Sequence, residues 1–139
     1  LKVWDLATGE KLATLTGHSS GVNAVAISPD GKQALSASRD STLKLWDLAT
    51  GEELATLTGH SDRVYAVAIT PDGKQAVSAS WDKTLKLWDL ATGEVVASFG
   101  GEGALLGCAI SPDGVTVVAG ESSGRVHFLR LEGLDTEEE

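Results

Sequence analysis

The chain is built from one segment that occurs twice in nearly the same form and a third time with many changes. Residues 1–42 and 43–84 align without a gap and are identical at 33 of 42 positions. A divergent copy follows at an offset of about 41 residues, with ISPDG at 110–114 in the place of ITPDG at 69–73. A module of this length cannot bury an apolar face alone, so such copies stack and share a core. The repeat therefore predicts an array of similar modules.

Each copy has the pattern of a small sheet. Its apolar residues alternate with a period of two in VNAVAIS, QALSAS, TLKLWDL and ELATLT, which is typical of strands. The segments between them, PDGK, RDS, ATGE and GHSS, carry the residues that turns require. Each copy thus predicts four antiparallel strands, and the whole chain predicts an all-β protein of about thirteen strands with no helices.

The charge of the chain argues against nucleic-acid and membrane partners. The formal net charge is −9, and five of the twenty acids lie in residues 132–139, which leaves −4 for residues 1–131. No basic stripe is present that could neutralise phosphates. No apolar run reaches membrane-spanning length and no secretion signal opens the sequence, so we expect a soluble, cytoplasmic protein. The single cysteine, Cys108, lies in an apolar strand pattern, which favours a buried thiol over a reactive one.

The polar residues of the two close copies recur at fixed offsets. Gly-His, Pro-Asp-Gly, a further aspartate and Trp-Asp occur together in both copies. With these motifs the chain resembles the WD40 repeat family of β-propellers over nearly all of residues 1–131. The resemblance implies a partial WD40 β-propeller of about three four-stranded antiparallel blades. Its expected parts are the last two strands of a truncated blade at 1–17, complete blades at 18–58 and 59–100, a degenerate terminal blade at 101–131, and an acidic tail at 132–139.

In that family a histidine, a serine, an aspartate and a tryptophan form a buried hydrogen-bonded tetrad. The resemblance implies two such structural tetrads, His18, Ser36, Asp40 and Trp46 in one blade and His60, Ser78, Asp82 and Trp88 in the next. Serine, histidine and aspartate are also the residue types of a hydrolase triad, so a serine hydrolase is an alternative. Against it, the set occurs twice, includes a tryptophan that would bury the serine, and lacks a Gly-x-Ser-x-Gly elbow. We therefore predict no catalytic residue.

No cofactor or metal site is predicted either. GEGALLG at 101–107 has the spacing Gly-x-Gly-x-x-x-Gly and precedes a strand, so it offers no helix N-terminus to a pyrophosphate. His127 is isolated in sequence and Cys108 has no partner at the spacing of metal ligands. The aspartates of the PDG motifs (Asp30, Asp72 and Asp113) are interpreted as turn residues.

The positions that differ between the close copies predict a contact surface. Five of the nine differences fall in two short segments, at positions 20/62, 21/63, 23/65, 39/81 and 41/83. The resemblance places both segments at one end of the ring, the usual surface for protein partners. Tyrosine, tryptophan and arginine dominate interface hot spots, so the predicted contact set is Arg63, Tyr65 and Trp81, extended by Asn23 and Arg39. The alternative is drifted surface positions, with Trp81 packing on its neighbouring blade.

The third copy loses the polar signature. Glu102, Ala119, Ser123 and Leu129 stand at the places of the tetrad histidine, serine, aspartate and tryptophan, so no tetrad is expected there. Terminal repeats are commonly atypical, which predicts the end of a propeller followed by a solvated tail. Because the sequence enters in the middle of a repeat and contains no methionine, we expect the C-terminal part of a longer protein.

Together these features predict a non-enzymatic scaffold that presents one end-face to a protein partner. The uniform repeats resemble those of bacterial, cyanobacterial-type proteins, so a C-terminal sensor of a larger signalling NTPase is one alternative. Purely architectural blades that assemble with like blades are another. An incomplete ring would be completed by missing upstream blades or by a homodimer, in which three blades per chain give six.

Overall fold

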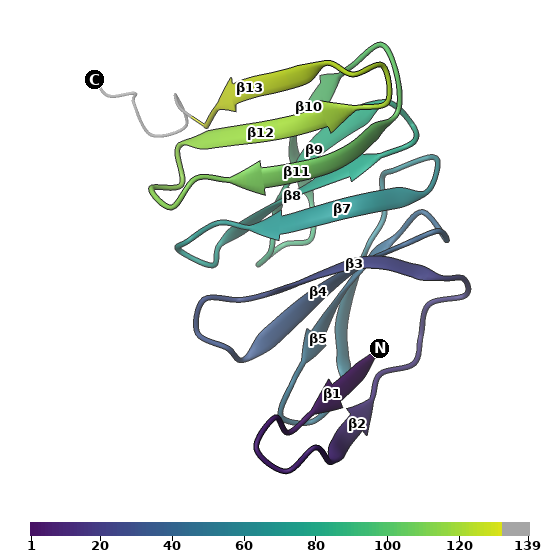
Figure 1. Ribbon diagram of the computed structural model, residues 1–139, viewed down its shortest axis with the longest axis vertical. Coiled ribbons are helices and arrows are strands. Elements are labelled where there is room, and N and C mark those ends of the chain that lie inside the picture. Colours follow the sequence, from purple (N-terminus) through teal and green to yellow (C-terminus); the bar gives the residue numbers. More distant parts are fainter. Residues whose placement is uncertain (132–139) are drawn as a thin grey trace.

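The computed structural model describes residues 1–131; residues 132–139, interpreted above as an acidic tail, lie outside the described residues. Thirteen strands form four antiparallel sheets in chain order, and residues 1–131 contain no helix (Figure 1). This confirms the all-β prediction. The first sheet has two strands, β1 (Lys2–Trp4) and β2 (Lys11–Thr14). The second has four, β3 (Val22–Ile27), β4 (Gln33–Ser38), β5 (Leu43–Asp47) and β6 (Glu53–Leu57). The third also has four, β7 (Val64–Ile69), β8 (Gln75–Ser80), β9 (Thr84–Asp89) and β10 (Val95–Gly100). The terminal sheet has three, β11 (Leu105–Ile110), β12 (Thr116–Glu121) and β13 (Val126–Arg130).

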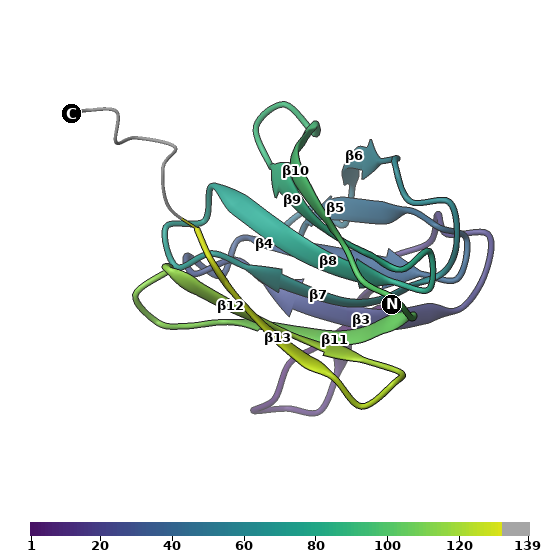
Figure 2. The same cartoon turned by 90° about the horizontal axis from the view of Figure 1, so that it is seen from above.

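The sheets stack through their first strands. Within each sheet every strand pairs only with its neighbours in sequence. Between sheets, β3 contacts β7 and β7 contacts β11, so these three strands lie one above the other (Figure 1). Seen from above, the later strands of the second and third sheets fan away from this inner row (Figure 2). The stack therefore has a narrow inner side and a broad outer side, as a sector of a ring does.

Short side-chain-supported turns set the register of each sheet. In the first Pro-Asp-Gly turn, Asp30 Oδ1 accepts hydrogen bonds from Ser28 Oγ at 2.6 Å and from the Lys32 N–H at 2.9 Å. Gly31 has a φ of 74°, which favours glycine because a Cβ is strained there. Asp72 and Asp113 occupy the same place in their turns. These aspartates thus act as turn residues in the structure.

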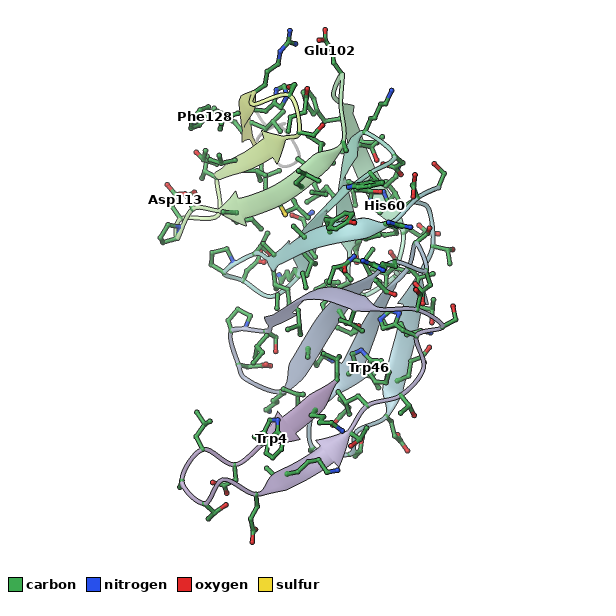
Figure 3. All side chains as sticks on the ribbon, turned by 45° about the vertical axis from the view of Figure 1, so that its right-hand side comes forward. Trp4, Trp46, His60, Glu102, Asp113 and Phe128 are labelled. Carbon is green, nitrogen blue, oxygen red and sulfur yellow. The ribbon has the colours of Figure 1, made fainter. Side chains whose placement is uncertain are left out.

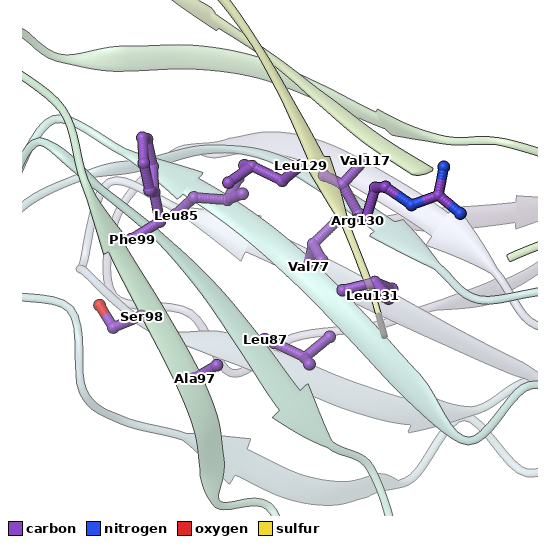
Figure 4. Close-up of a pocket in the computed structure, with 10 residues that line it drawn as sticks. All are labelled: Val77, Leu85, Leu87, Ala97, Ser98, Phe99, Val117, Leu129, Arg130 and Leu131. Carbon is purple, nitrogen blue, oxygen red and sulfur yellow. The ribbon is translucent and has the colours of Figure 1, made fainter. Parts of the chain in front are cut away.

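Two apolar clusters fill the joints between sheets. Trp88 is fully buried between the second and third sheets, among Leu35, Leu43 and Leu57. At the next joint the equivalent residue is Leu129, which packs against the cluster around Leu105 and Val117. Leucine is smaller than tryptophan, and a cavity of about 140 Å³ lies beside Leu129, between β9, β10 and β13 (Figure 4). The last joint therefore leaves space beside the leucine that replaces the tryptophan.

The turns divide the molecule into two ends. One end carries the three Pro-Asp-Gly turns between the first two strands of the second, third and terminal sheets, and we call it the PDG end. The opposite end carries the loops before each first strand and the turns between the second and third strands, and we call it the Gly-His end. Figure 3 shows Asp113 at one side and His60 at the other. All predicted tetrad histidines and contact residues belong to the Gly-His end.

Candidate functional site

Two polar clusters stand side by side at the Gly-His end, one in each four-stranded sheet. In the second sheet His18 Nδ1 lies 2.9 Å from Asp40 Oδ2, and His18 Nε2 lies 2.6 Å from Ser36 Oγ. The indole N–H of Trp46 donates to Ser36 Oγ at 2.8 Å. The structure thus brings together all four residues of the first predicted tetrad.

The third sheet repeats this arrangement. The distances are 2.7 Å from His60 Nδ1 to Asp82 Oδ2, 2.6 Å from His60 Nε2 to Ser78 Oγ, and 2.7 Å from Trp88 Nε1 to Ser78 Oγ. One proton arrangement satisfies every group: tryptophan donates to serine, serine donates to a neutral imidazole at Nε2, and the imidazole Nδ1–H donates to the aspartate. Each cluster therefore ties a loop, two strands and a turn into one unit.

Burial and hydrogen bonding set the charges of the third-sheet cluster. Burial lowers the pKa of His60 below its ordinary 6.5, and the nearby Asp82 only partly opposes this shift. Burial raises the pKa of Asp82, but hydrogen bonds from Thr84, His60 and Ser61 outweigh it and bring the pKa to about 2. The pair is therefore a neutral imidazole beside a charged carboxylate at neutral pH.

A threonine completes each cluster, and the sequence analysis missed it. Thr42 Oγ1 donates to Asp40 Oδ1 at 2.6 Å and the Thr42 N–H donates to the same oxygen at 2.9 Å. Thr84 makes the same two bonds to Asp82. The signal was available, because a threonine follows each aspartate by two residues in RDST and WDKT. These bonds hold the aspartate while the residue between, Ser41 or Lys83, adopts a φ of 75° or 73°.

The hydrogen-bond order of these clusters is that of a hydrolase triad, but the serine has no solvent access. Ser36 and Ser78 are both 0 % exposed, and each carries a tryptophan N–H on its oxygen. A nucleophilic serine must reach a substrate carbonyl beside an oxyanion site. The clusters therefore have the geometry of structural ties.

The terminal sheet holds a different polar cluster. Glu121, whose side chain is buried, accepts from Ser123 Oγ at 2.6 Å and lies 2.9 Å from His127 Nε2. His127 is isolated in sequence but has partners in the fold, because the hairpin of β12 and β13 brings it to Glu121 and places its ring on Phe99. Hydrogen bonds from Ser123 and then His127 lower the pKa of Glu121 to about 2. The cluster stands two residues along β12 from Ala119, the position of the tetrad serine.

A glycine-containing loop closes around this glutamate. A Cβ on Gly101 would lie 2.7 Å from Glu121 Oε2, and the Glu102 N–H donates to the same oxygen at 3.3 Å. The Glu102 side chain points to solvent, where it pairs with Arg125 at 2.8 Å (Figure 3). The segment GEGALLG therefore packs around the buried Glu121 carboxylate, and it continues into β11 rather than into a helix.

The predicted contact residues form a stack on the third sheet. Tyr65 and Trp81 are stacked with ring centroids 5.4 Å apart and an interplanar angle of 28°. The Arg63 guanidinium lies over the Trp81 ring, with Cζ 5.2 Å from the ring centroid. Trp81 is 42 % exposed. The structure thus brings Arg63, Tyr65 and Trp81 together at the surface.

Asn23 and Arg39 are placed differently. Asn23 is half-buried and its side-chain N–H donates to the Val64 carbonyl at 3.1 Å, which joins the second sheet to the third. Arg39 is exposed and its stem lies over Gly21, where a Cβ would be 3.6 Å from Arg39 Cδ. Arg39 therefore offers its guanidinium to solvent, while Asn23 holds the joint beneath it.

The described residues offer little for metal or thiol chemistry. Within residues 1–131 there is no group of three or more His, Cys, Asp or Glu side chains that could hold a metal ion. Burial raises the pKa of Cys108 to about 12, so the thiol stays protonated. No helix in this part of the chain is long and apolar enough to cross a membrane.

The stacked sheets with a histidine, serine, aspartate and tryptophan tie in each complete unit define a repeat protein of the β-propeller class. The family model "WD domain, G-beta repeat" matches residues 9–47 and 51–89, which together make up more than half of the chain. The chain therefore belongs to the WD40 repeat family, and each complete sheet is one blade.

Curated relatives match single repeats of this chain. It is 52 % identical over 42 residues to "Nuclear distribution protein PAC1" of Arthroderma benhamiae, and 44 % identical over 43 residues to "Lissencephaly-1 homolog 1" of Paramecium tetraurelia. It is 42 % identical over 41 residues to "Autophagy-related protein 16" of Arabidopsis thaliana. These matches cover 30 %, 31 % and 30 % of the chain, but only 9 %, 11 % and 8 % of the relatives. They support a protein-interaction role in general.

Proposed function

We propose that this chain is a non-enzymatic scaffold whose Gly-His end binds a protein partner. The observation that carries the proposal is the exposed stack of Arg63, Trp81 and Tyr65. The stack combines a large apolar area with a charged group, as interface hot spots do. It also lies where the two nearly identical blades differ most, so it gives one blade a surface that the other lacks.

Rigidity of this end favours binding. Asp82, in the turn after β8, accepts the Ser61 N–H of the loop before β7 at 3.1 Å and the hydroxyl of Thr84, at the start of β9, at 2.6 Å. The stack is built on these two segments, since Arg63 follows the loop and Trp81 begins the turn. Preorganised side chains lose little conformational entropy when a partner binds.

The test compares capture of partners by three forms of the protein. Wild type, the variant R63A/Y65A/W81A and the control K32A/K74A are immobilised and exposed to extract of the source cells. The control removes two exposed lysines at the PDG end of the same blades. Each protein captured by wild type is then purified and titrated against all three forms. We expect at least about a tenfold loss of affinity in the stack variant alone, which corresponds to 1.4 kcal/mol. Equal affinity of all three forms contradicts the proposal.

Architectural self-assembly is a second candidate, favoured by the exposed apolar flanks. In the first sheet Trp4 is 52 % exposed, whereas Trp46 and Trp88 at the same repeat position are buried. At the other flank Phe128 on β13 is 74 % exposed. Closure of a six-bladed dimer would pair β2 of each copy with β13 of the other. A sensor role in a signalling NTPase, a bacterial source and a cytoplasmic location stay predictions of the sequence; the three named relatives are eukaryotic proteins.

A further inference from the structure

The Gly-His end of the two complete blades carries three basic side chains and three aspartates. Its exposed or half-buried basic side chains are Arg39, Arg63 and Lys83, and we call these three residues the cationic site. The aspartates of this end are occupied: Asp40 and Asp82 are held in the tetrads, and Asp62 Oδ1 accepts the Arg63 backbone N–H at 2.7 Å. Residues 1–131 as a whole carry a formal charge of −4. The three cations therefore balance these three aspartates in formal charge, but the carboxylates of Asp40 and Asp82 are bound within the blades.

The two guanidinium groups of this site are available to a ligand. Within residues 1–131 no carboxylate oxygen lies within 4.0 Å of the side-chain nitrogens of Arg39 or Arg63. By contrast, Arg125 at the same end pairs with Glu102 at 2.8 Å, and Lys44 pairs with Glu53 at 2.8 Å. An unpaired guanidinium presents a planar fork of donors that matches a carboxylate in a bidentate contact.

Arg63 is also oriented before any ligand arrives. Its guanidinium lies over the Trp81 ring, which is itself stacked on Tyr65. Stacking on an aromatic face leaves the N–H edges of a guanidinium free. Trp81 is itself 42 % exposed and offers apolar area beside the guanidinium. A ligand that fits would therefore carry a carboxylate next to an apolar side chain.

We propose that the cationic site binds an acidic peptide segment of the partner protein. Aspartate or glutamate side chains contact Arg63 and Arg39, and a neighbouring apolar side chain packs on Trp81. This inference rests on the proposed function and names the chemistry of the partner.

A selection experiment tests the inference because a chain with a net charge of −9 repels acidic peptides unless unpaired basic side chains bind them. A displayed library of random dodecapeptides is selected separately against the full chain, R39A/R63A, K32A/K74A and the stack variant R63A/Y65A/W81A. The two double variants lose the same charge from opposite ends of the same blades. We expect wild type and K32A/K74A to enrich peptides in which aspartate or glutamate adjoins an apolar residue, and R39A/R63A to lose that enrichment.

The most enriched peptide is then synthesised with its acids intact and with each acid replaced by its amide. We expect about a tenfold or greater loss of affinity for the amide peptide and for R39A/R63A, since each removes charge-assisted hydrogen bonds. Circular dichroism spectra that match wild type verify folding of both variants.

The outcomes separate this inference from the proposed function. Enrichment of basic or uncharged peptides whose binding needs Arg63 and Trp81 would overturn the inference that the ligand is acidic. The proposed function of this end as a binding surface would still stand. If R63A/Y65A/W81A enriches the same peptides as wild type, or if no peptide is enriched, the result counts against the inference and against the proposed function. Tighter binding of a single-stranded DNA dodecamer than of the peptide would assign the site to nucleic acid and overturn the inference.

Discussion

Ser36 and Ser78 are the hubs of the two complete blades. Each serine oxygen accepts one N–H from tryptophan and donates its own proton to histidine, so a single atom joins two neighbouring strands to the loop that carries the histidine. Removal of such a hub leaves two buried groups without partners, which costs more than the loss of one exposed hydrogen bond. The stability of each complete blade therefore depends strongly on the hydrogen bonds of one serine oxygen.

The variant S78A tests this concentration. It is nearly isosteric but leaves the Trp88 N–H and His60 Nε2 unpaired, so we expect the free energy of unfolding to fall by about 1 to 3 kcal/mol. The control S98A removes an exposed hydroxyl on β10 that accepts from Lys86, and we expect a change within about 0.5 kcal/mol. Urea unfolding followed by far-ultraviolet circular dichroism gives both values. Equal urea midpoints for S78A and S98A would refute the role of Ser78 as a hub.

The same residues predict how stability depends on pH. Unfolded His60 takes up a proton near pH 6.5, whereas the folded form has a lower pKa, so stability falls as pH drops below about 6.5. Unfolded Asp82 is protonated near pH 3.8, but the folded form keeps its charge to about pH 2, so stability falls again between these values. Urea midpoints measured from pH 8 to 3 check this profile. A midpoint that stays constant from pH 7 to 5 would contradict the role of His60.

The terminal sheet shows that a hydrogen-bonded tie can move along a strand. Ala119 replaces the serine, but Glu121, two residues further on β12, lies on the same face because side chains alternate with a period of two. His127 on β13 and Ser123 in the turn then replace tryptophan and aspartate as its partners. The blade keeps a polar tie while losing the original residues.

The fit of the loop around this glutamate can be tested with two adjacent glycines. In G101A the new Cβ would lie 2.7 Å from Glu121 Oε2, which is held by other bonds, so we expect a loss of about 1 to 3 kcal/mol in unfolding free energy. The control G100A places a Cβ where no atom lies within 4 Å. Thermal unfolding of the two variants measures the difference. A G101A protein as stable as G100A would show that the loop does not close on Glu121.

The sequence predicts the strands and turns better than it predicts single side-chain contacts. The period of two and the recurring turns were sufficient for the all-β fold, because both depend on local backbone geometry. The sequence analysis missed the Glu121 cluster because its residues differ in type or position from those of the two tetrads. The bond from Asn23 to the Val64 carbonyl was also missed, since it depends on how one sheet sits on the next. Local patterns carry no direct information on such joints.

The whole molecule is a stack with two open flanks. Ile27 on β3 is 62 % exposed, whereas its counterpart Ile69 packs against the cluster between the second and third sheets. Phe128 is exposed at the opposite flank. Apolar faces of this kind beside unpaired strand edges promote association with another sheet.

Light scattering over a concentration series tests this expectation. We expect the mass of wild type to rise above the monomer value of 14.4 kDa, while I27D/F128D stays at that value, because a charge on either flank opposes burial. The control L54D introduces the same change on β6, in the outermost strand of a complete blade. A wild-type mass of 14.4 kDa at all concentrations would exclude self-association. A rise that I27D/F128D does not reduce would place the contact elsewhere.

The near identity of the two complete blades also bears on how the chain reaches its fold. A strand such as β4 meets almost the same side chains on β9 as on its native partner β5. Side-chain recognition therefore discriminates weakly between native and swapped pairings, and the short connections must decide, because closing a longer loop costs more entropy. Refolding should then divide between direct folding and a slow correction of exchanged strands. Double-jump refolding experiments, in which the native population is counted at each delay, would resolve the two routes.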